Sequence, residues 1–109
     1  MNTLEYHVLL ALSSGALHGY AVKDAIAADS GGSQTPRAGT LYRVVARLIT
    51  GGLVRETEPA DGRTPHPGLE RRYYALTAAG RRALADEAKR LKTTAAIAEK
   101  RLNAIRTRS

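Results

Sequence analysis

The chain has 109 residues, a formal net charge of +7 and no cysteine. That length predicts one domain with a modest core, to which a partner subunit would add burial. The absence of cysteine excludes disulfides, thiolate metal sites and a cysteine nucleophile, and it favours a reducing compartment. No apolar run approaches about 18 residues and no signal-peptide pattern is present, so we expect a soluble cytoplasmic protein without membrane contact.

The positive charge increases along the chain. The net charge is −2 over residues 1–36, +3 over residues 37–76 and +6 over residues 77–109. An excess of cations indicates an anionic partner such as nucleic acid, but basic side chains also serve for solubility alone. The charge by itself leaves both explanations open.

Two helices are predicted at the start of the chain. Asn2 and Glu5 have the spacing of a capping box, which predicts a first helix over residues 3–14. A second helix is expected from Gly19 to Ala28, and Ser30-Gly31-Gly32 ends it. The apolar residues assigned to the second helix are Tyr20, Val22 and Ile26.

The stretch Thr35–Val54 predicts a third helix, which meets the second at an angle as in a helix-turn-helix unit. Apolar residues at positions 41, 44, 45, 48 and 49 have the spacing of a helix with one face in a core, and Arg43 and Arg47 stand opposite. Pro36 suits the start of this helix and Gly51-Gly52 its end. An ordinary amphipathic surface helix and a helix presented to a ligand both fit this pattern.

Two strands are predicted next, over Leu53–Glu58 and Arg71–Leu76. Tyr74 and Leu76 share one face of the second strand and are expected in the core. The twelve residues between the strands contain three prolines and two glycines, so they exceed a tight hairpin loop. They predict a projecting wing, with a plain disordered loop as the alternative.

Thr77 is predicted to cap a long final helix in which apolar residues repeat in sevens. This is the a/d seam of a coiled coil, and a second copy of the chain is the expected cover, with the first helix contributing. Packing against the first helix within one chain is the alternative. The predicted dimerisation residues are Leu4, Val8, Leu84, Ala88, Leu91, Ala95, Ala98, Leu102 and Ile105.

These elements predict a mainly α fold with a small two-stranded antiparallel β wing. Residues 1–76 would form a winged helix-turn-helix DNA-binding domain, and residues 77–109 a C-terminal dimerisation helix, within one compact unit. The segments HGYAVKDAI (His18–Ile26), GTLYRVVARLITGGLV (Gly39–Val54) and RRYYALTAAGRRAL (Arg71–Leu84) resemble the three signature blocks of the PadR family of transcriptional regulators. The single final helix is similar to the shorter members of that family.

The resemblance implies repression, with release when a small-molecule effector or another signal changes the geometry of the dimer. Two copies of the third helix in a two-fold homodimer predict a palindromic operator. We expect the helix Arg37–Thr50 to enter the major groove of double-stranded DNA, with Thr40, Arg43 and Tyr42 near base edges. Tyr42 equally fits a packing role, and Arg43 stands where the family often has proline. The predicted DNA-binding residues are Lys23, Arg37, Thr40, Tyr42, Arg43, Arg47, Arg63, His66, Arg71 and Arg72.

An enzyme is the least favoured class, because the sequence lacks the HExxH, GxSxG and GxxxxGK[ST] patterns. We therefore expect no catalytic residue, no cofactor and no metal. The alternative function is a dimeric winged-helix module that mainly binds a small hydrophobic ligand or a protein and binds DNA only weakly. Its ligand pocket would lie between the first and last helices, near Tyr6, His7 and Leu91.

Overall fold

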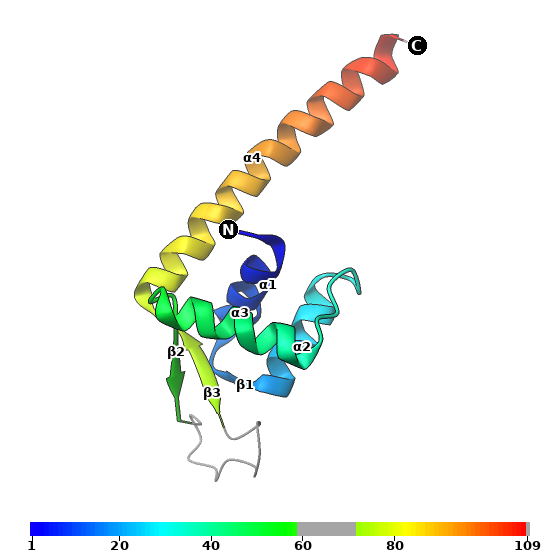
Figure 1. Ribbon diagram of the computed structural model, residues 1–109. Coiled ribbons are helices and arrows are strands. Elements are labelled where there is room, and N and C mark those ends of the chain that lie inside the picture. Colours follow the sequence, from blue (N-terminus) through cyan, green and yellow to red (C-terminus); the bar gives the residue numbers. More distant parts are fainter. Residues whose placement is uncertain (59–71, 109) are drawn as a thin grey trace.

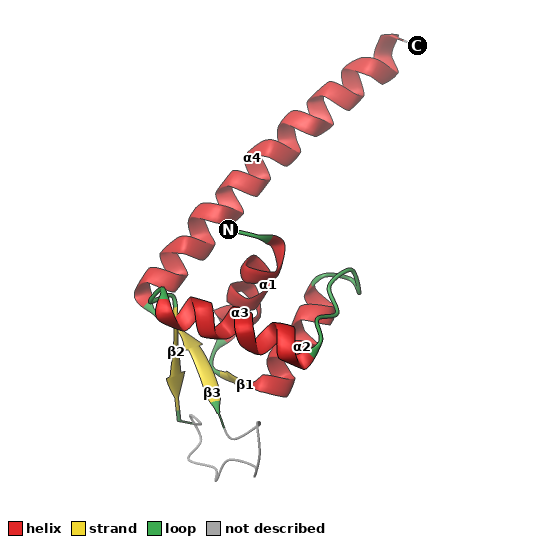
Figure 2. Cartoon of the chain, viewed as in Figure 1, coloured by secondary structure: helices red, strands yellow, loops and turns green. Residues whose placement is uncertain are grey.

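The computed structural model describes residues 1–58 and 72–108. Three helices and a small sheet form a body, and one long helix extends away from it (Figure 1 and Figure 2). The elements, in chain order, are α1 Thr3–Ala11, the short 3₁₀ helix η1 Leu12–Ser14, β1 Leu17–His18, α2 Gly19–Asp29, α3 Ala38–Thr50, β2 Val54–Thr57, β3 Tyr73–Leu76 and α4 Ala78–Arg108.

The helix ends follow the capping residues expected from the sequence. Asn2 and Glu5 form the capping box of α1, with both hydrogen bonds at 2.8 Å. Thr77 caps α4, because its hydroxyl accepts from the backbone N–H of Gly80 at 3.0 Å. Gly52 ends α3 at φ 77°, and the N–H groups of residues 52 and 53 bond back to the carbonyls of residues 49 and 48. That pair of bonds is a Schellman motif, which places glycine where a side chain would be strained.

The core lies between α1, α2, α3 and the sheet. The apolar stripe of α3 enters it as predicted, and Tyr74 and Leu76 are buried there as well. Two assignments are wrong. Tyr20 is 54% exposed and does not belong to the apolar side of α2. Val8 is 0% exposed within one chain, so it fills the core and is not available to a dimer interface.

The sheet has three strands in the order β1-β3-β2, where the sequence predicted two. β2 and β3 form the antiparallel wing hairpin, with Val54 opposite Leu76. The additional strand β1 pairs antiparallel with β3, placing Leu17 opposite Tyr74. A strand of two residues is too short to show an alternating pattern, which explains why it was missed. The predicted class, mainly α with a small antiparallel sheet, is confirmed.

Among the described residues, only the first turns of α4 contact the body: Gly80 lies against Leu53, and Ala83 and Leu84 pack against the core. From Lys89 to Thr107 every side chain of this helix is exposed. The molecule is therefore elongated, with extents of 61 × 26 × 24 Å. Within the described residues, no helix combines the length and the apolarity that crossing a lipid bilayer requires.

Candidate nucleic-acid interface

The first turns of α3 present a cationic surface. Arg37 precedes the helix in an extended conformation, and Arg37, Thr40 and Arg43 are all exposed. The Arg43 guanidinium folds back toward the start of the helix, where Nη2 donates to the Thr40 hydroxyl at 3.4 Å. Positive charge therefore collects at the end of α3 whose backbone N–H groups have no helical partner, and both features attract anions.

Tyr42 packs between α2 and α3. Its side chain is half-buried, and a Cβ atom at Gly19 would lie 2.9 Å from the Tyr42 hydroxyl. Gly19 thus leaves the space that the ring occupies. Lys23 lines the same shallow hollow between the two helices. Tyr42 therefore has the packing role given as its alternative, and it sits beside the exposed residues of α3.

Arg47 stands one turn beyond Arg43, nearer the α1 end of the helix. Its Nη2 lies 3.8 Å from Glu5 Oε2, so its charge is partly compensated. The Arg47 side chain remains 60% exposed. A phosphate approaching Arg47 would meet the Glu5 carboxylate as well, which weakens the attraction.

On the wing, Arg72 donates from Nη1 to Glu56 Oε1 at 3.1 Å, across the two strands of the hairpin. Both side chains are exposed, so the pair is open to competition from an external anion. The other predicted wing residues, Arg63, His66 and Arg71, lie outside the described residues, as does the twelve-residue connection.

Two features of the α2 region were missed by sequence reasoning. Tyr20 projects from the start of α2 and lines the hollow that Tyr42 and Lys23 share. His18 caps α2, accepting from the N–H of Ala21 at 3.3 Å, and its ring meets that of Tyr73 edge-on at 5.6 Å. Because the second helix was expected to start at Gly19, the sequence could have identified His18 as its N-cap. The exposure of Tyr20 depends on the angle between α2 and α3, which the sequence does not show.

The predicted ligand pocket near α1 and α4 stays a prediction. The Tyr6 and His7 rings contact each other edge-on at 5.8 Å, and the buried His7 Nδ1 has no hydrogen-bond partner among the residues that the structure describes. Leu91 is on the part of α4 that leaves the body. Two hollows of about 400 and 510 Å³ lie elsewhere, on either side of the turn that follows α1.

Comparison with known proteins places this geometry in a family. The model of the transcriptional regulator PadR-like family matches residues 8–86, which run from within α1 to the first turns of α4. The uncharacterized 37.1 kDa protein in transposon TN4556 of Streptomyces fradiae is 40% identical to the chain over 87 residues. That alignment covers 80% of the chain, and the chain spans only 22% of that relative.

Solved structures share the fold. A PadR family transcription regulator from hypervirulent Clostridium difficile R20291 superposes with a TM-score of 0.73 at 17% identity, covering 93% of this chain and 99% of the other. Bacillus subtilis PadR in complex with operator DNA gives a TM-score of 0.62 at 25% identity, over 78% of this chain and 46% of that one. The body and the start of α4 therefore have the arrangement found in these regulators.

Proposed function

The chain belongs to the transcriptional regulator PadR-like family, and from that premise we propose that it represses transcription by binding a palindromic operator as a homodimer. The observation that carries this proposal is the division of α3 into two faces. Leu41, Val44 and Leu48 are buried in the core, while Arg37, Thr40 and Arg43 are exposed at its first turns. A helix fixed along one face and cationic along the other is suited to the major groove.

Within the groove, Arg43 is assigned to a base edge and Thr40 supports it. The fork of an arginine matches the O6 and N7 acceptors of guanine, and one such contact discriminates between bases by about 1–3 kcal/mol. Tyr42 is proposed to hold this part of α3 in place by packing against Gly19 at the start of α2. Arg37 and Lys23 flank this position and are assigned to phosphates, which hold the register without reading sequence.

The wing and the far end of α3 are assigned to the DNA backbone. Arg63, His66 and Arg71 are proposed to reach phosphate or the minor groove. Arg72, at the base of the wing, is proposed to leave its ion pair with Glu56 and bind a DNA phosphate instead. Arg47 is proposed to make the same kind of exchange with Glu5. The Arg72–Glu56 pair is exposed on both sides and contributes about 0–1 kcal/mol to folding stability, whereas in the Arg47–Glu5 pair only the arginine is exposed. Each exchange would replace an ion pair by a contact with DNA.

The homodimer rests on α4. Leu91, Leu102 and Ile105 are exposed in a heptad register on the part of α4 that extends from the body. Two copies paired through this seam, with Leu4, Leu84 and Ala88 at its base, would present two α3 helices about 34–36 Å apart on successive turns of DNA. The remaining seam residues are Ala95 and Ala98. The solved complex of Bacillus subtilis PadR with operator DNA supports DNA as the partner.

The proposal is tested by fluorescence anisotropy with DNA from upstream of the chain's own gene and a shuffled duplex of equal length. Each titration is run at two salt concentrations. We expect a preference for the upstream DNA that persists when added salt weakens both complexes. Steep salt dependence with equal affinity for the two duplexes would contradict sequence-specific regulation and favour the ligand- or protein-binding module.

A further inference from the structure

Most of the net positive charge of the chain lies on the part of α4 that extends from the body. Residues 88–108 contain seven basic residues and one acidic residue, Glu99, so their net charge is +6 against +7 for the whole chain. In Figure 1 this part of the helix leads away from α3 and from the wing strands β2 and β3. None of the residues assigned to the operator lies on α4, so the proposed function leaves this charge unexplained.

Helical spacing places part of this charge on the face of α4 that is opposite the seam. Lys89 and Lys100 lie about 160° and 180° around the helix axis from Leu91, and Lys92 lies between their face and the seam. All three lysines are exposed, and none has an ion pair in the part of the chain that the structure describes. We call Lys89, Lys92 and Lys100 the outward lysines. They stay accessible when a second copy covers the seam.

The phosphate backbone of DNA is the partner whose charge fits this face best. Lys89 and Lys100 are about 16 Å apart along the helix axis, and a duplex carries one negative charge per about 1.7 Å of its own axis. Lysine binds phosphate as a point charge and does not have the planar fork by which arginine reads a base edge. The outward lysines are therefore suited to DNA of any sequence.

A lipid surface fits this face less well. In the described part of α4, Ile97 is the one large apolar side chain outside the seam, and it is 43% exposed. A basic helix that lies in a membrane surface buries a broad apolar face there. The seam of α4 would supply such a face only in a monomer, because the proposed homodimer covers it.

The DNA that meets the outward lysines is separate from the DNA at α3. Lys100 is about 33 Å along the helix from Ala78, in the direction that leads away from the wing strands in Figure 1. A duplex held by α3 would have to bend sharply to reach it, and the persistence length of DNA is about 150 base pairs. A second segment meets the lysines without that deformation.

We propose that the outward lysines bind the phosphate backbone of a second DNA segment, of any sequence, while α3 holds the operator. This inference rests on the proposed function, in which DNA is the partner of α3. One dimer would then hold two DNA segments together, because binding of the first raises the effective concentration of the second. The second contact is made to phosphates alone, so added salt should weaken it steeply.

Two-colour fluorescence cross-correlation tests whether one protein molecule carries two duplexes. The first duplex is DNA from upstream of the chain's own gene, and the second is a shuffled duplex with a different fluorophore. The operator occupies both copies of α3 in the proposed homodimer, so the shuffled duplex reports another surface. We expect a saturable signal at about 50 mM salt that falls at about 200 mM.

Variants at two of the outward lysines assign the signal to α4. Lys89→Gln combined with Lys100→Gln should weaken binding of the shuffled duplex about tenfold or more, and leave the affinity for upstream DNA within about twofold. Lys89→Arg combined with Lys100→Arg keeps both charges, so we expect wild-type binding of both duplexes.

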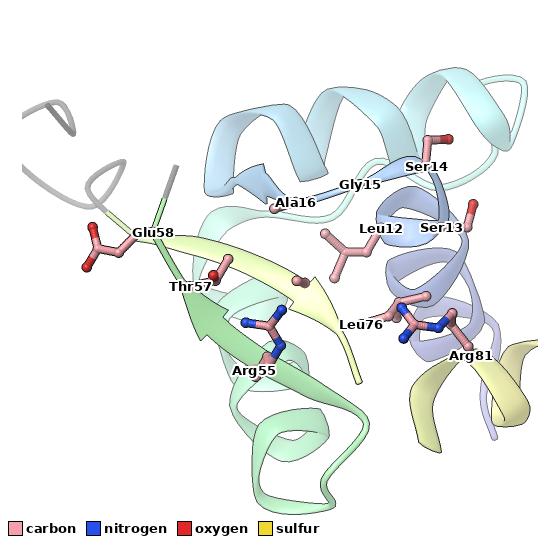
Figure 3. A pocket seen from close by; sticks show the side chains of 11 residues that line it. Leu12, Ser13, Ser14, Gly15, Ala16, Arg55, Thr57, Glu58, Leu76 and Arg81 are labelled. Carbon is pink, nitrogen blue, oxygen red and sulfur yellow. The ribbon is translucent and has the colours of Figure 1, made fainter. Parts of the chain in front are cut away.

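Arg55→Gln combined with Arg81→Gln is the matched control, because it removes the same charge from a different surface. Figure 3 shows Arg55 on β2 and Arg81 in the first turns of α4, where both line a hollow of about 400 Å³. The lining of this hollow does not extend along α4 beyond Arg81. The control should therefore leave binding of both duplexes within about twofold.

The second site would be overturned by any of three results: no cross-correlation in the wild-type protein, an unchanged signal in the glutamine variant, or an equal loss in the control. Polyglutamate that displaces the shuffled duplex at equal charge concentration would overturn DNA as the partner and favour an acidic protein. Equal affinity for upstream and shuffled DNA would refute the proposed function instead. In that case the NMR signals of residues 89–100 decide the second site: shifts caused by shuffled DNA support it, and their absence overturns it.

Discussion

The absence of a side chain at Gly80 allows α4 to approach the turn after α3 closely. It is buried in the first turn of the helix, and a Cβ atom there would overlap the Leu53 carbonyl oxygen. The Leu76 side chain closes the same space at 3.3 Å. The Thr77 hydroxyl also donates to the carbonyl of Gly52 at 2.6 Å, so both contacts join α4 to the end of α3 through backbone atoms.

Gly80→Ala should therefore destabilise the protein, although alanine is the better helix former by about 1 kcal/mol. The added methyl group meets backbone that cannot move aside as a flexible side chain would, and overpacking of this kind costs about 1–3 kcal/mol. Urea unfolding followed by circular dichroism measures the difference. Gly39→Ala is the matched control, because its Cβ would meet only the Arg43 guanidinium at 3.9 Å and should not lower stability. An unchanged midpoint for Gly80→Ala would contradict the close approach.

Tyr74 links stability to pH. Burial, followed by the nearby Glu56 carboxylate, raises the pKa of the Tyr74 hydroxyl above 10.0. The unfolded chain therefore loses this proton first as the pH rises, and the stability contributed by neutral Tyr74 is complete below about pH 10 and lost through the folded-state pKa. Unfolding free energies should fall as the pH rises above about 10, and less steeply in Tyr74→Phe. An equal dependence of the unfolding free energy on pH in the wild-type protein and in Tyr74→Phe would show that other groups cause the loss of stability.

At the scale of elements, the two ends of α3 have different surroundings. The first turns are open and cationic, whereas Arg47 is close to the Glu5 carboxylate of α1. A 13-residue helix thus carries one segment suited to reading bases and another whose charge the protein partly neutralises. Mutations at the first turns of α3 should consequently affect discrimination between DNA sequences, and mutations at its far end should affect affinity for all DNA sequences.

Arg43→Ala should narrow the difference in affinity between the operator and a shuffled duplex by about 1–3 kcal/mol, because a bidentate base contact is lost. Arg47→Ala should lower the affinity for both duplexes equally, because one phosphate contact is lost. The slope of log K against log salt concentration should become shallower by about 1. Anisotropy titrations over a range of salt concentrations separate the two effects. An Arg43→Ala protein with unaltered discrimination would remove this residue from the base-reading role.

Glu5→Gln tests the competition at Arg47. Removal of the carboxylate frees the guanidinium for phosphate, so affinity for operator and shuffled DNA should rise together by about twofold to fivefold. The substitution retains a side chain that can hydrogen-bond to the N–H of Asn2, which limits the loss of the capping box. Unchanged or weaker binding of both duplexes would place Arg47 away from the DNA.

At the scale of the whole molecule, α4 is much longer than the part of it that packs against the body. Its 31 residues extend for about 46 Å, and little more than its first three turns contact the rest of the chain. Leu102 is 60% exposed and Ile105 is 64% exposed near the far end. Apolar side chains in this register favour a second copy, although the alanines of the seam bury little area.

Leu102→Lys combined with Ile105→Lys should shift the protein toward monomer in sedimentation equilibrium, because two charges would enter the apolar seam. The same variant should lose affinity for a two-half-site operator far more than for a single half-site. Asn103→Lys combined with Thr107→Lys adds the same charge outside the seam and should stay dimeric. A wild-type protein that sediments as a monomer at the concentrations used for DNA binding would contradict the homodimer.

Much of the fold was predictable because its signals are local. The capping box at Asn2, the glycine that ends α3 and the apolar stripe of that helix depend on residues within a few positions of one another, and all were predicted correctly. β1 was not predicted, because a two-residue strand has no periodicity and forms only when β3 lies beside it. The prediction that Tyr20 lies on the apolar side of α2 was wrong for a related reason. Which side chains of α2 are exposed depends on where α3 crosses that helix.

The sequence by itself determined the order of α1, α2, α3, the two wing strands and α4, the basic face of α3 and the family. Each of these is carried by local spacing or by motifs in order. Only the tertiary structure decided which charges are paired. Arg47 with Glu5 and Arg72 with Glu56 are 42 and 16 positions apart, and no spacing rule brings them together. It also decided that Val8 is core and that Arg55 and Arg81 share a hollow. Ion pairs, burial and cavities depend on distances through space, which the folded chain sets.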